Sequence, residues 1–459
     1  MHVPELIESL VGIVGASAVD SGEDVHEDDT HDECLTVPPV RPQAVVRPTE
    51  TAQVARILEL AQEHGVPVTA RGSGTGLSGA ATPVADGIVV CFDRMDRILE
   101  IDTENHLAVV QPGVRLVDLD EALRPLGLVY PVYPGEYSAS IGGNVATNAG
   151  GMRAVKYGVT RHQVLGLEVV LAGGEVMRTG GRFVKSTTGY DLTQLIVGSE
   201  GTLALVTEVI IRLYPRPEHQ ATVLAPFSTL DEVTAAVPRI VDSGIGPVVL
   251  EYIDLLTMSA TASYSGLELG IPQEIKDTAL AYLVVVLEND HEERLEEDLG
   301  AVAGQLAELG ALDVFVLPPA AAADLIAARE QAFWMAKANG ADDIVDVVVP
   351  RAQIPVFMQR VSELAAEYDA WIAGCGHAGD GNVHLGVFCA DDERRGRLLH
   401  ELFASGMALG GAISAEHGIG GAKKEHFLEL EDPAKIALMR RLKSAFDPAG
   451  ILNPGTIFD

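Results

Sequence analysis

The sequence predicts an α+β protein in two parts, the second of which is a ferredoxin-like, split-βαβ domain. Two consecutive β-α-β sets carry this prediction, because residues 221–253 and 281–317 each read as strand, helix and strand. A third observation is the change of composition at the Pro-rich run 214–219, which marks a boundary between the parts. At 459 residues the chain is long enough for two or three domains with buried cores.

Acidic residues dominate the composition. The chain has 66 Asp and Glu against 32 Lys and Arg, a formal charge of −34, so a nucleic-acid partner is not expected. Its four cysteines lack C-x-x-C spacing, which argues against a disulfide framework and a thiolate zinc site. Residues 4–18 lack a basic flank and suit an amphipathic helix, and no run approaches the ~20 apolar residues of a transmembrane segment. We therefore expect a cytoplasmic protein.

Hydrophobic periodicity predicts the elements of the first part in order. A helix with apolar residues at helical spacing ends at Gly65, and a short buried strand follows it. Leu116 begins a second helix, which ends near Gly127. Residues 24–34 are rich in His, Asp and Glu but lack fixed spacing, so a solvated loop is expected there. Strands are expected at 66–70, 88–92, 107–111, 166–171 and 175–178.

The second part continues with helices around a histidine-containing segment. Residues 376–384 are rich in glycine, which favours turns and short strands over a helix. The expected elements are strands at 221–226, 247–253, 281–288 and 312–317 and helices at 230–243, 291–309, 320–338, 352–368, 391–409 and 433–446.

Three glycine-rich loops lie in the first part. The loop 71–79 contains G-x-G-x-x-G, but no helical pattern follows it, so the Rossmann interpretation fails. A strand–loop–strand nest of backbone N–H groups remains, which is by itself an anion cradle. Together with the loops at 140–151 and 197–203, it indicates a large, flat, polar ligand, because glycines let the main chain approach a ring or a phosphate closely.

A candidate metal site lies near the C-terminus. His377 and His384 flank a Gly-Asp-Gly turn, so two short strands could bring both imidazoles together, and Glu416 could complete a set of two histidines and one carboxylate. The alternative is a simple hairpin turn with structural histidines. His417 adjoins Glu416 and suits a general base, the alternative being an ordinary loop histidine.

These motifs together resemble those of FAD-linked oxidases with the vanillyl-alcohol-oxidase/p-cresol-methylhydroxylase fold. The similarity is strongest to the branch of D-lactate dehydrogenase, the glycolate-oxidase flavoprotein subunit and D-2-hydroxyglutarate dehydrogenase. It rests on five motifs in the same order: Arg71–Gly79, Ile141–Gly151, Gly198–Leu203, His377–His384 and Ser414–Gly420. The resemblance implies a two-part FAD-binding domain at 1–217, a ferredoxin-like substrate or cap domain at 218–410, and a segment 411–459 that returns to the FAD domain.

The resemblance also implies the ligands of each group. Zinc or manganese would bind His377, His384 and Glu416. Many relatives attach FAD covalently through a histidine where this chain has Thr75, so dissociable FAD is expected. The residues that would hold FAD are Arg71, Gly72, Ser73, Gly74, Thr75, Gly76, Ser78, Pro134, Gly135, Gly142, Gly143, Asn144, Thr147, Asn148, Gly150, Gly151, Glu200, Gly201 and Asn453.

The implied function is FAD-dependent oxidation of a D-2-hydroxy acid to the 2-oxo acid. Arg329 would hold the substrate carboxylate, and His417 would take the hydroxyl proton. Phe333 and Ile344 stand where dicarboxylate-specific relatives have Thr and Lys, which favours a D-lactate-like substrate with a small or apolar side chain. Reduced FAD would pass electrons to a quinone, a cytochrome, a carrier flavoprotein or oxygen, and a membrane-bound acceptor would bring the protein to a membrane surface.

Several alternatives stay open. Within the same family, the chain could be a glycolate or D-2-hydroxyglutarate dehydrogenase, or a non-catalytic flavoprotein subunit of a larger complex. Outside it, a metal hydrolase would need no flavin, and a non-redox flavin transferase would use a run of histidines that this chain lacks. A homodimer is compatible with the sequence, which does not specify the oligomeric state.

Overall fold

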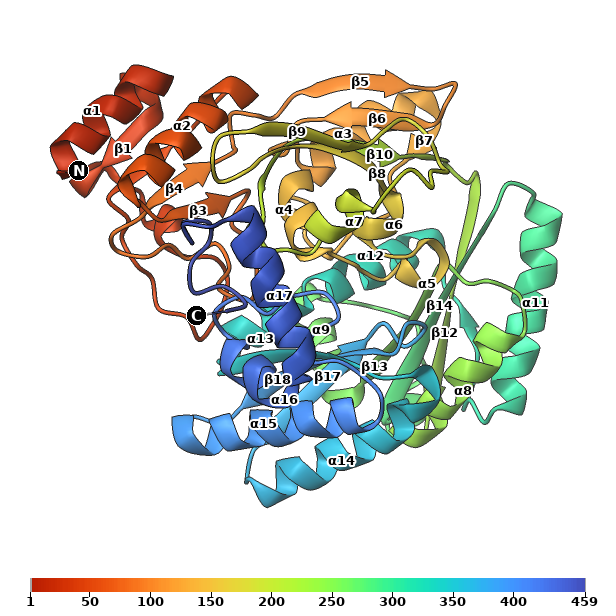
Figure 1. The fold of residues 1–459 in the computed structure, drawn as a ribbon. Coiled ribbons are helices and arrows are strands. Elements are labelled where there is room, and N and C mark those ends of the chain that lie inside the picture. The colour runs from red at the N-terminus through yellow and green to blue at the C-terminus, as the bar shows by residue number, and fades with distance from the viewer. Residues whose placement is uncertain (1, 459) are drawn as a thin grey trace.

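The computed structural model describes residues 2–458. Its N-terminal half contains a four-stranded and a five-stranded sheet (Figure 1), and β7 and β11 form a further two-stranded sheet. The four-stranded sheet has the order β1-β2-β4-β3 and packs against α1 and α2. Strand β1 is antiparallel to β2, and the other two pairs are parallel. The five-stranded sheet is antiparallel, has the order β5-β6-β10-β8-β9, and packs against α3 and α4. The elements are α1 (Val3–Val14), β1 (Val19–Ser21), β2 (Ala44–Val46), α2 (Thr51–His64), β3 (Val68–Arg71), β4 (Ile88–Cys91), β5 (Ile98–Asp102), β6 (Leu107–Val110), α3 (Leu116–Leu123), β7 (Leu128–Val129), α4 (Ile141–Thr147), α5 (Ala154–Tyr157), α6 (Thr160–Gln163), β8 (Val164–Val170), β9 (Val176–Gly180), α7 (Leu192–Ile196), β10 (Leu205–Arg212) and β11 (Tyr214–Pro215).

The predicted elements of this half are present. Helix α2 ends at Gly65, whose φ of 64° is the left-handed conformation that glycine adopts readily. Strands β3, β4, β6, β8 and β9 match the predicted strands to within a few residues. The chain between β3 and β4 forms turns and bends and contains no helix, which agrees with the failure of the Rossmann motif.

The expectation of a solvated loop at residues 24–34 is wrong for its second half. Asp29, Thr30 and Asp32 are buried. Asp29 pairs with Arg47 at 2.6 Å and lies 3.4 Å from Arg71, so the segment packs beneath the first glycine loop. The two arginines lie more than ten residues away along the chain, and the local charge pattern therefore gave no sign of these partners.

The C-terminal half contains one antiparallel sheet with the order β15-β12-β14-β13-β17-β18-β16. Its first four strands have the ferredoxin-like arrangement that the two β-α-β sets predicted, and β17, β18 and β16 extend the sheet. The elements are β12 (His219–Phe227), α8 (Leu230–Asp242), β13 (Val249–Asp254), α9 (Leu255–Ser265), α10 (Gln273–Lys276), β14 (Ala281–Asn289), α11 (Glu292–Glu308), β15 (Phe315–Val316), α12 (Pro319–Glu330), α13 (Ala332–Ala338), β16 (Asp343–Val348), α14 (Ile354–Glu367), β17 (Trp371–Gly376), β18 (Asn382–Phe388), α15 (Asp392–Ala408), α16 (Lys424–Leu430) and α17 (Pro433–Phe446).

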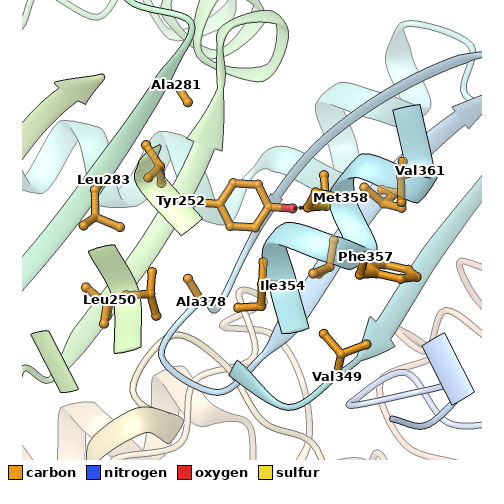
Figure 2. Packing of buried hydrophobic residues seen from close by; sticks show 14 of the residues in the cluster. Leu250, Tyr252, Ala281, Leu283, Val349, Ile354, Phe357, Met358, Val361 and Ala378 are labelled. Atoms are coloured by element: carbon orange, nitrogen blue, oxygen red, sulfur yellow. Dashed lines mark hydrogen bonds between the residues drawn. The ribbon is translucent and has the colours of Figure 1, made fainter. Parts of the chain in front are cut away.

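The two faces of this sheet have different roles. Helices α8, α11, α14 and α15 cover one face and enclose the main core. Figure 2 shows Tyr252 of β13 in this core, with its hydroxyl directed at the Met358 sulfur 3.7 Å away on α14. Helices α9, α12 and α13 lie on the other face, which is turned toward the N-terminal half (Figure 1). The predicted histidine segment follows β17 on this sheet.

The helix predicted at 320–338 is two helices. Gln331, between α12 and α13, has a ψ of 6°, outside the α-helical range, and interrupts the hydrogen-bond ladder. In the described part of the chain, no helix has the length and apolar character needed to cross a bilayer. After α17 the chain returns to the first half, where Leu452 forms a parallel bridge with Val68.

Candidate functional site

A β-hairpin brings His377 and His384 together. His377 directly follows β17, His384 lies in β18, and their ring centroids are 4.8 Å apart. Gly381 in the connecting turn has a φ of 85°, and a Cβ there would lie 2.0 Å from the Val349 carbonyl oxygen. Only glycine therefore permits this tight turn. The hairpin explains how a spacing of seven residues produces adjacent imidazoles.

Glu416 completes the cluster from a segment beyond α15. Its Oε2 lies 3.5 Å from Nε2 of His377 and 3.9 Å from Nε2 of His384. The three potential ligand atoms lie within 4.8 Å of one another. Two imidazoles and one carboxylate, gathered in this way on a cavity wall, fit a divalent transition metal with open coordination positions.

The protonation preferences of His384 and Glu416 suit metal ligands, whereas His377 must lose a proton to bind a metal. Burial lowers the pKa of His377, but Glu251 and Glu416 raise it to about 10. Burial lowers the pKa of His384 well below its usual value, and the neighbouring His377 lowers it further, so His384 is neutral with a free lone pair. Although burial raises it, the pKa of the Glu416 carboxyl is lowered to about 2 by His377 and His384, so Glu416 is ionised.

Glu251 of β13 supports this cluster, and the sequence reasoning missed it. Its Oε1 lies 2.5 Å from Nδ1 of His377, and its Oε2 lies 2.7 Å from an Arg329 nitrogen. A carboxylate behind a metal-binding histidine fixes the ring and raises its basicity. The only available signal was a glutamate inside the apolar run 248–253, a place where an unpaired charge is unfavourable.

Asp346 of β16 holds the segment that carries Glu416 and His417, and it too was missed as a site residue. Its fully buried Oδ2 accepts backbone N–H bonds from residues 415, 416 and 417 at 3.1, 2.9 and 2.9 Å. Lys423 pairs with Oδ1. Burial raises the pKa of Asp346, but His417 and Lys423 lower it to about 2, so a permanent anion anchors the segment.

His417 stacks on His384 with ring centroids 5.3 Å apart. Its Nδ1 faces Oδ1 of Asp346 at 3.7 Å, which leaves Nε2 as the nitrogen available to a substrate. Burial lowers the pKa of His417, and Lys423 lowers it further while Asp346 opposes the shift. The structure therefore presents a neutral imidazole beside the three potential metal ligands.

One cavity of about 460 Å³ connects this cluster to the glycine loops of the first half. Arg329 and His417, the predicted catalytic residues, line it together with His377, His384 and Glu416. The predicted cofactor residues that line it are Arg71, Gly72, Ser73, Gly74, Thr75, Gly76, Ser78, Pro134, Gly135, Gly142, Gly143, Asn144, Thr147, Glu200, Gly201 and Asn453.

Three predicted cofactor residues do not line the cavity. Asn148 ends α4 and accepts a hydrogen bond from the Arg161 backbone at 2.9 Å. The Gly151 N–H donates to Oε1 of Glu416 at 2.6 Å, and a Cβ on Gly150 would lie 2.3 Å from the same oxygen. Gly150 therefore leaves room for Glu416, and the backbone of Gly151 binds its carboxylate.

The side chain of Arg71 lies beneath the first glycine loop and binds the backbone of the segment 24–34. Its Nη1 donates to the His31 carbonyl at 2.6 Å, and its guanidinium packs beneath the loop, where a Cβ on Gly74 would lie 2.1 Å from it. The backbone of the loop, and not this side chain, is thus the part that faces the cavity as an anion cradle. Ser140 ties the first loop to α4, since its Oγ accepts N–H bonds from Ser73 at 3.4 Å and Gly143 at 3.3 Å.

Glu200 and Asn453 join the cofactor loops to the C-terminal segment. Asn453 accepts from the Ala70 N–H at 2.9 Å and donates to the Glu200 carbonyl at 2.9 Å. The Glu200 carboxyl accepts from the N–H groups of Ile419 and Gly420 at 2.8 and 2.7 Å. Burial raises the pKa of this carboxyl to about 7. Elements of both halves therefore fix the backbone just after His417.

Comparison with protein families gives two matches. The family described as FAD linked oxidases, C-terminal domain, matches residues 216–457, and the FAD binding domain matches residues 42–180. The chain is 59% identical over 454 residues to an uncharacterized FAD-linked oxidoreductase of Mycobacterium tuberculosis, with 99% of each chain covered. It is 37% identical over 467 residues to a D-lactate dehydrogenase of Anaerostipes hadrus, covering 99% of this chain and 97% of the relative.

Among solved structures, p-cresol methylhydroxylase with substrate bound superposes with a TM-score of 0.82. The alignment covers 99% of this chain and 97% of that one at 19% sequence identity. At this identity the likeness concerns the fold, and it confirms the expected p-cresol-methylhydroxylase type.

Proposed function

Because this chain belongs to the FAD-linked oxidases, we propose that it uses FAD to oxidise a D-2-hydroxy acid with a small or apolar side chain to the 2-oxo acid. One observation carries the proposal. The His377–His384–Glu416 cluster, Arg329 and His417 line the same cavity as the glycine loops. A hydroxy acid needs a site for its carboxylate, a site for its hydroxyl and a proton acceptor beside a hydride acceptor, and this cavity offers all of them.

Arg329 binds the substrate carboxylate. Its guanidinium is almost fully buried, and its Nε has no hydrogen-bond partner among the described residues. Glu251 pairs with one terminal nitrogen and so fixes the orientation of the guanidinium. The remaining donors suit the planar, two-oxygen recognition of a carboxylate.

His377, His384 and Glu416 hold a divalent cation, zinc or manganese. Bound there, the cation would bind substrate oxygens and lower the pKa of the hydroxyl group. The Glu251–His377 pair and the Gly151 N–H bond to Glu416 keep two of the ligands oriented.

His417 takes the hydroxyl proton. Its neutral ring has Nε2 available, while Asp346 faces Nδ1 and stabilises the imidazolium that forms. As the proton leaves the hydroxyl oxygen, C2 loses a hydride with its two electrons and the C2–O bond becomes double. FAD supplies the hydride acceptor.

The side-chain preference rests on Phe333 and Ile344, which both line the cavity. Neither can hydrogen-bond or pair with a second carboxylate, and a buried, unpaired carboxylate is strongly unfavourable. We therefore favour a monocarboxylic substrate over D-2-hydroxyglutarate. The final electron acceptor is one of the four classes named above.

Anaerobic bleaching of the bound flavin tests this function. The purified holoenzyme is mixed with single D- and L-2-hydroxy acids, before and after chelation of the metal. We expect bleaching by D-acids only and its loss with chelator. Bleaching by L-acids alone, equal rates for D-lactate and D-2-hydroxyglutarate, or indifference to metal removal would contradict the proposal.

A further inference from the structure

We propose that the chain has a second divalent metal site, formed by His400 of α15 with His426 and Glu429 of α16, and that this site binds zinc. One nitrogen of each imidazole and one carboxylate oxygen lie within 4.8 Å of one another. None of the three residues is among those that line the cavity, so the site is separate from the cluster described above. The proposal goes beyond the proposed function and does not depend on it.

The periodicity of two neighbouring helices brings these side chains together. Helices α15 and α16 lie side by side (Figure 1). His426 and Glu429 are three residues apart in α16, so they lie on one face of that helix. His400 and Phe403 have the same spacing in α15, and their ring centroids lie 5.9 and 5.1 Å from that of His426. The ligand-bearing faces of the two helices are therefore turned toward each other.

Both helices are held in place by the main core. Leu402 and Phe403 of α15 are buried in it, and Phe427 and Leu430 of α16 pack against it. The backbone that carries the three ligands is thus fixed before any ion binds. Binding then orders only side chains, which keeps its entropic cost low.

His426 has a nitrogen without a partner. Its Nδ1 is buried and has no hydrogen-bond partner among the described residues, which is unfavourable unless a ligand occupies the position. Burial lowers the pKa of His426, and His400 lowers it further, while Glu429 and Glu425 oppose the shift. The ring is therefore neutral near pH 7, which is the form that can offer a lone pair to a metal.

His400 and Glu429 make the site accessible and select the ion. Their side chains are 39% and 65% exposed, so an ion reaches them directly from solvent. Nδ1 of His400 lies 3.4 Å from Oε2 of Glu429, about the separation of two ligands on a tetrahedral zinc with bonds of about 2.1 Å. Two imidazoles favour zinc over magnesium and calcium, which prefer oxygen ligands.

A bound ion would fasten α16 to α15. Helix α16 begins directly after Lys423, which pairs with Asp346 and so helps to anchor the segment of Glu416 and His417. The ion would therefore stabilise the end of this segment from outside the cavity. Because zinc would bind the folded state at this site, added zinc should raise the melting temperature.

Zinc titration of the holoenzyme variant His377→Ala, His384→Ala tests the site, because this variant lacks the proposed ligands in the cavity. Competition with a chromophoric chelator should show about one zinc ion per chain, bound with roughly micromolar affinity, weaker than at a four-ligand structural site. An ion bound this weakly leaves during purification, so only added zinc fills the site. In the wild type the same ion appears as a second equivalent. The absence of binding in both proteins, or displacement of zinc by about a hundredfold excess of magnesium, would overturn the proposal.

Matched variants identify the ligands. Glu429→Gln removes a proposed ligand, whereas Glu425→Gln makes the same change of charge at an exposed residue of the same helix. Zinc affinity should fall at least about tenfold in the first variant and less than about threefold in the second. His400→Gln should abolish both the micromolar binding and a zinc-dependent rise of roughly 2 to 5 °C in melting temperature. Equal affinities in the two glutamate variants, or unchanged binding in His400→Gln, would overturn the assignment.

Discussion

Nδ1 of His377 lies 2.5 Å from Oε1 of Glu251, a residue 126 positions earlier in the chain. The same glutamate pairs with Arg329 through its other oxygen at 2.7 Å. One buried carboxylate thus orients a proposed metal ligand and the proposed substrate-binding arginine together. The two binding functions of the site depend on each other through this side chain.

The first prediction follows from this double pairing. Glu251→Gln should weaken divalent cation binding about 10- to 100-fold, because His377 loses the carboxylate that orients it. It should also lower the free energy of unfolding by about 3 kcal/mol or more, because Arg329 loses its buried partner. Competition with a chromophoric chelator and urea denaturation measure the two effects. The exposed Glu268→Gln is the control. Equal affinities of the two variants for the divalent cation would argue against the proposal that Glu251 orients His377.

A second prediction concerns the metal content. Elemental analysis of the purified protein should find about one zinc or manganese ion per chain, and the double variant His377→Ala, His384→Ala should contain none. Because the loops proposed to hold FAD lie in other segments of the chain, the variant should keep its flavin absorbance. A metal content that does not differ between the two proteins would show that the ion binds elsewhere.

A third prediction concerns how FAD is held. Thr75 has no nucleophilic imidazole to attach to the flavin, so precipitation with acid should release FAD into the supernatant. Flavin that remains with the precipitated polypeptide, fluorescent on a denaturing gel, would indicate a covalent bond to another residue. The apoprotein should regain its flavin absorbance when FAD is added.

Glu330 gives a prediction about pH. Burial raises the pKa of its carboxyl from 4.5 to about 7 in the folded protein. The folded state therefore favours the neutral form, so this residue contributes stability below about pH 4.5 that is lost as the pH rises to about 7. The loss is at most about 3.5 kcal/mol, since one pKa unit corresponds to about 1.4 kcal/mol.

The test compares urea denaturation of the wild type and Glu330→Gln between pH 4.5 and 8. Other buried carboxyls titrate in both proteins and cancel in the difference. The stability of the variant relative to the wild type should increase with pH across this range. A difference that does not change with pH would mean that Glu330 titrates normally.

Much of the fold could be predicted because its signals are local. The left-handed conformation of Gly65 ends α2. The order of strand and helix patterns along the second half predicted the two β-α-β sets. The extension of the sheet by β16 could not be predicted in this way, because its strand order depends on pairings between distant segments. The hairpin of His377 and His384 could be predicted in part. Its glycine turn is a local signal, but the strands that pair with it on either side come from distant segments.

The site residues likewise fall into those that local motifs predict and those that only distant contacts reveal. The sequence by itself determined the residue types: two histidines around a glycine turn, a Glu-His pair, and three glycine-rich segments. It did not predict that the second of these segments, expected as a loop, contains the helix α4. Only the tertiary structure decided that Glu251 and Asp346 support them, that Gly150 makes room for Glu416, and that Asp29 packs beneath a glycine loop. The physical reason is that a motif records local backbone geometry, whereas a buried charge is stabilised by whichever partner the folded polypeptide brings near it.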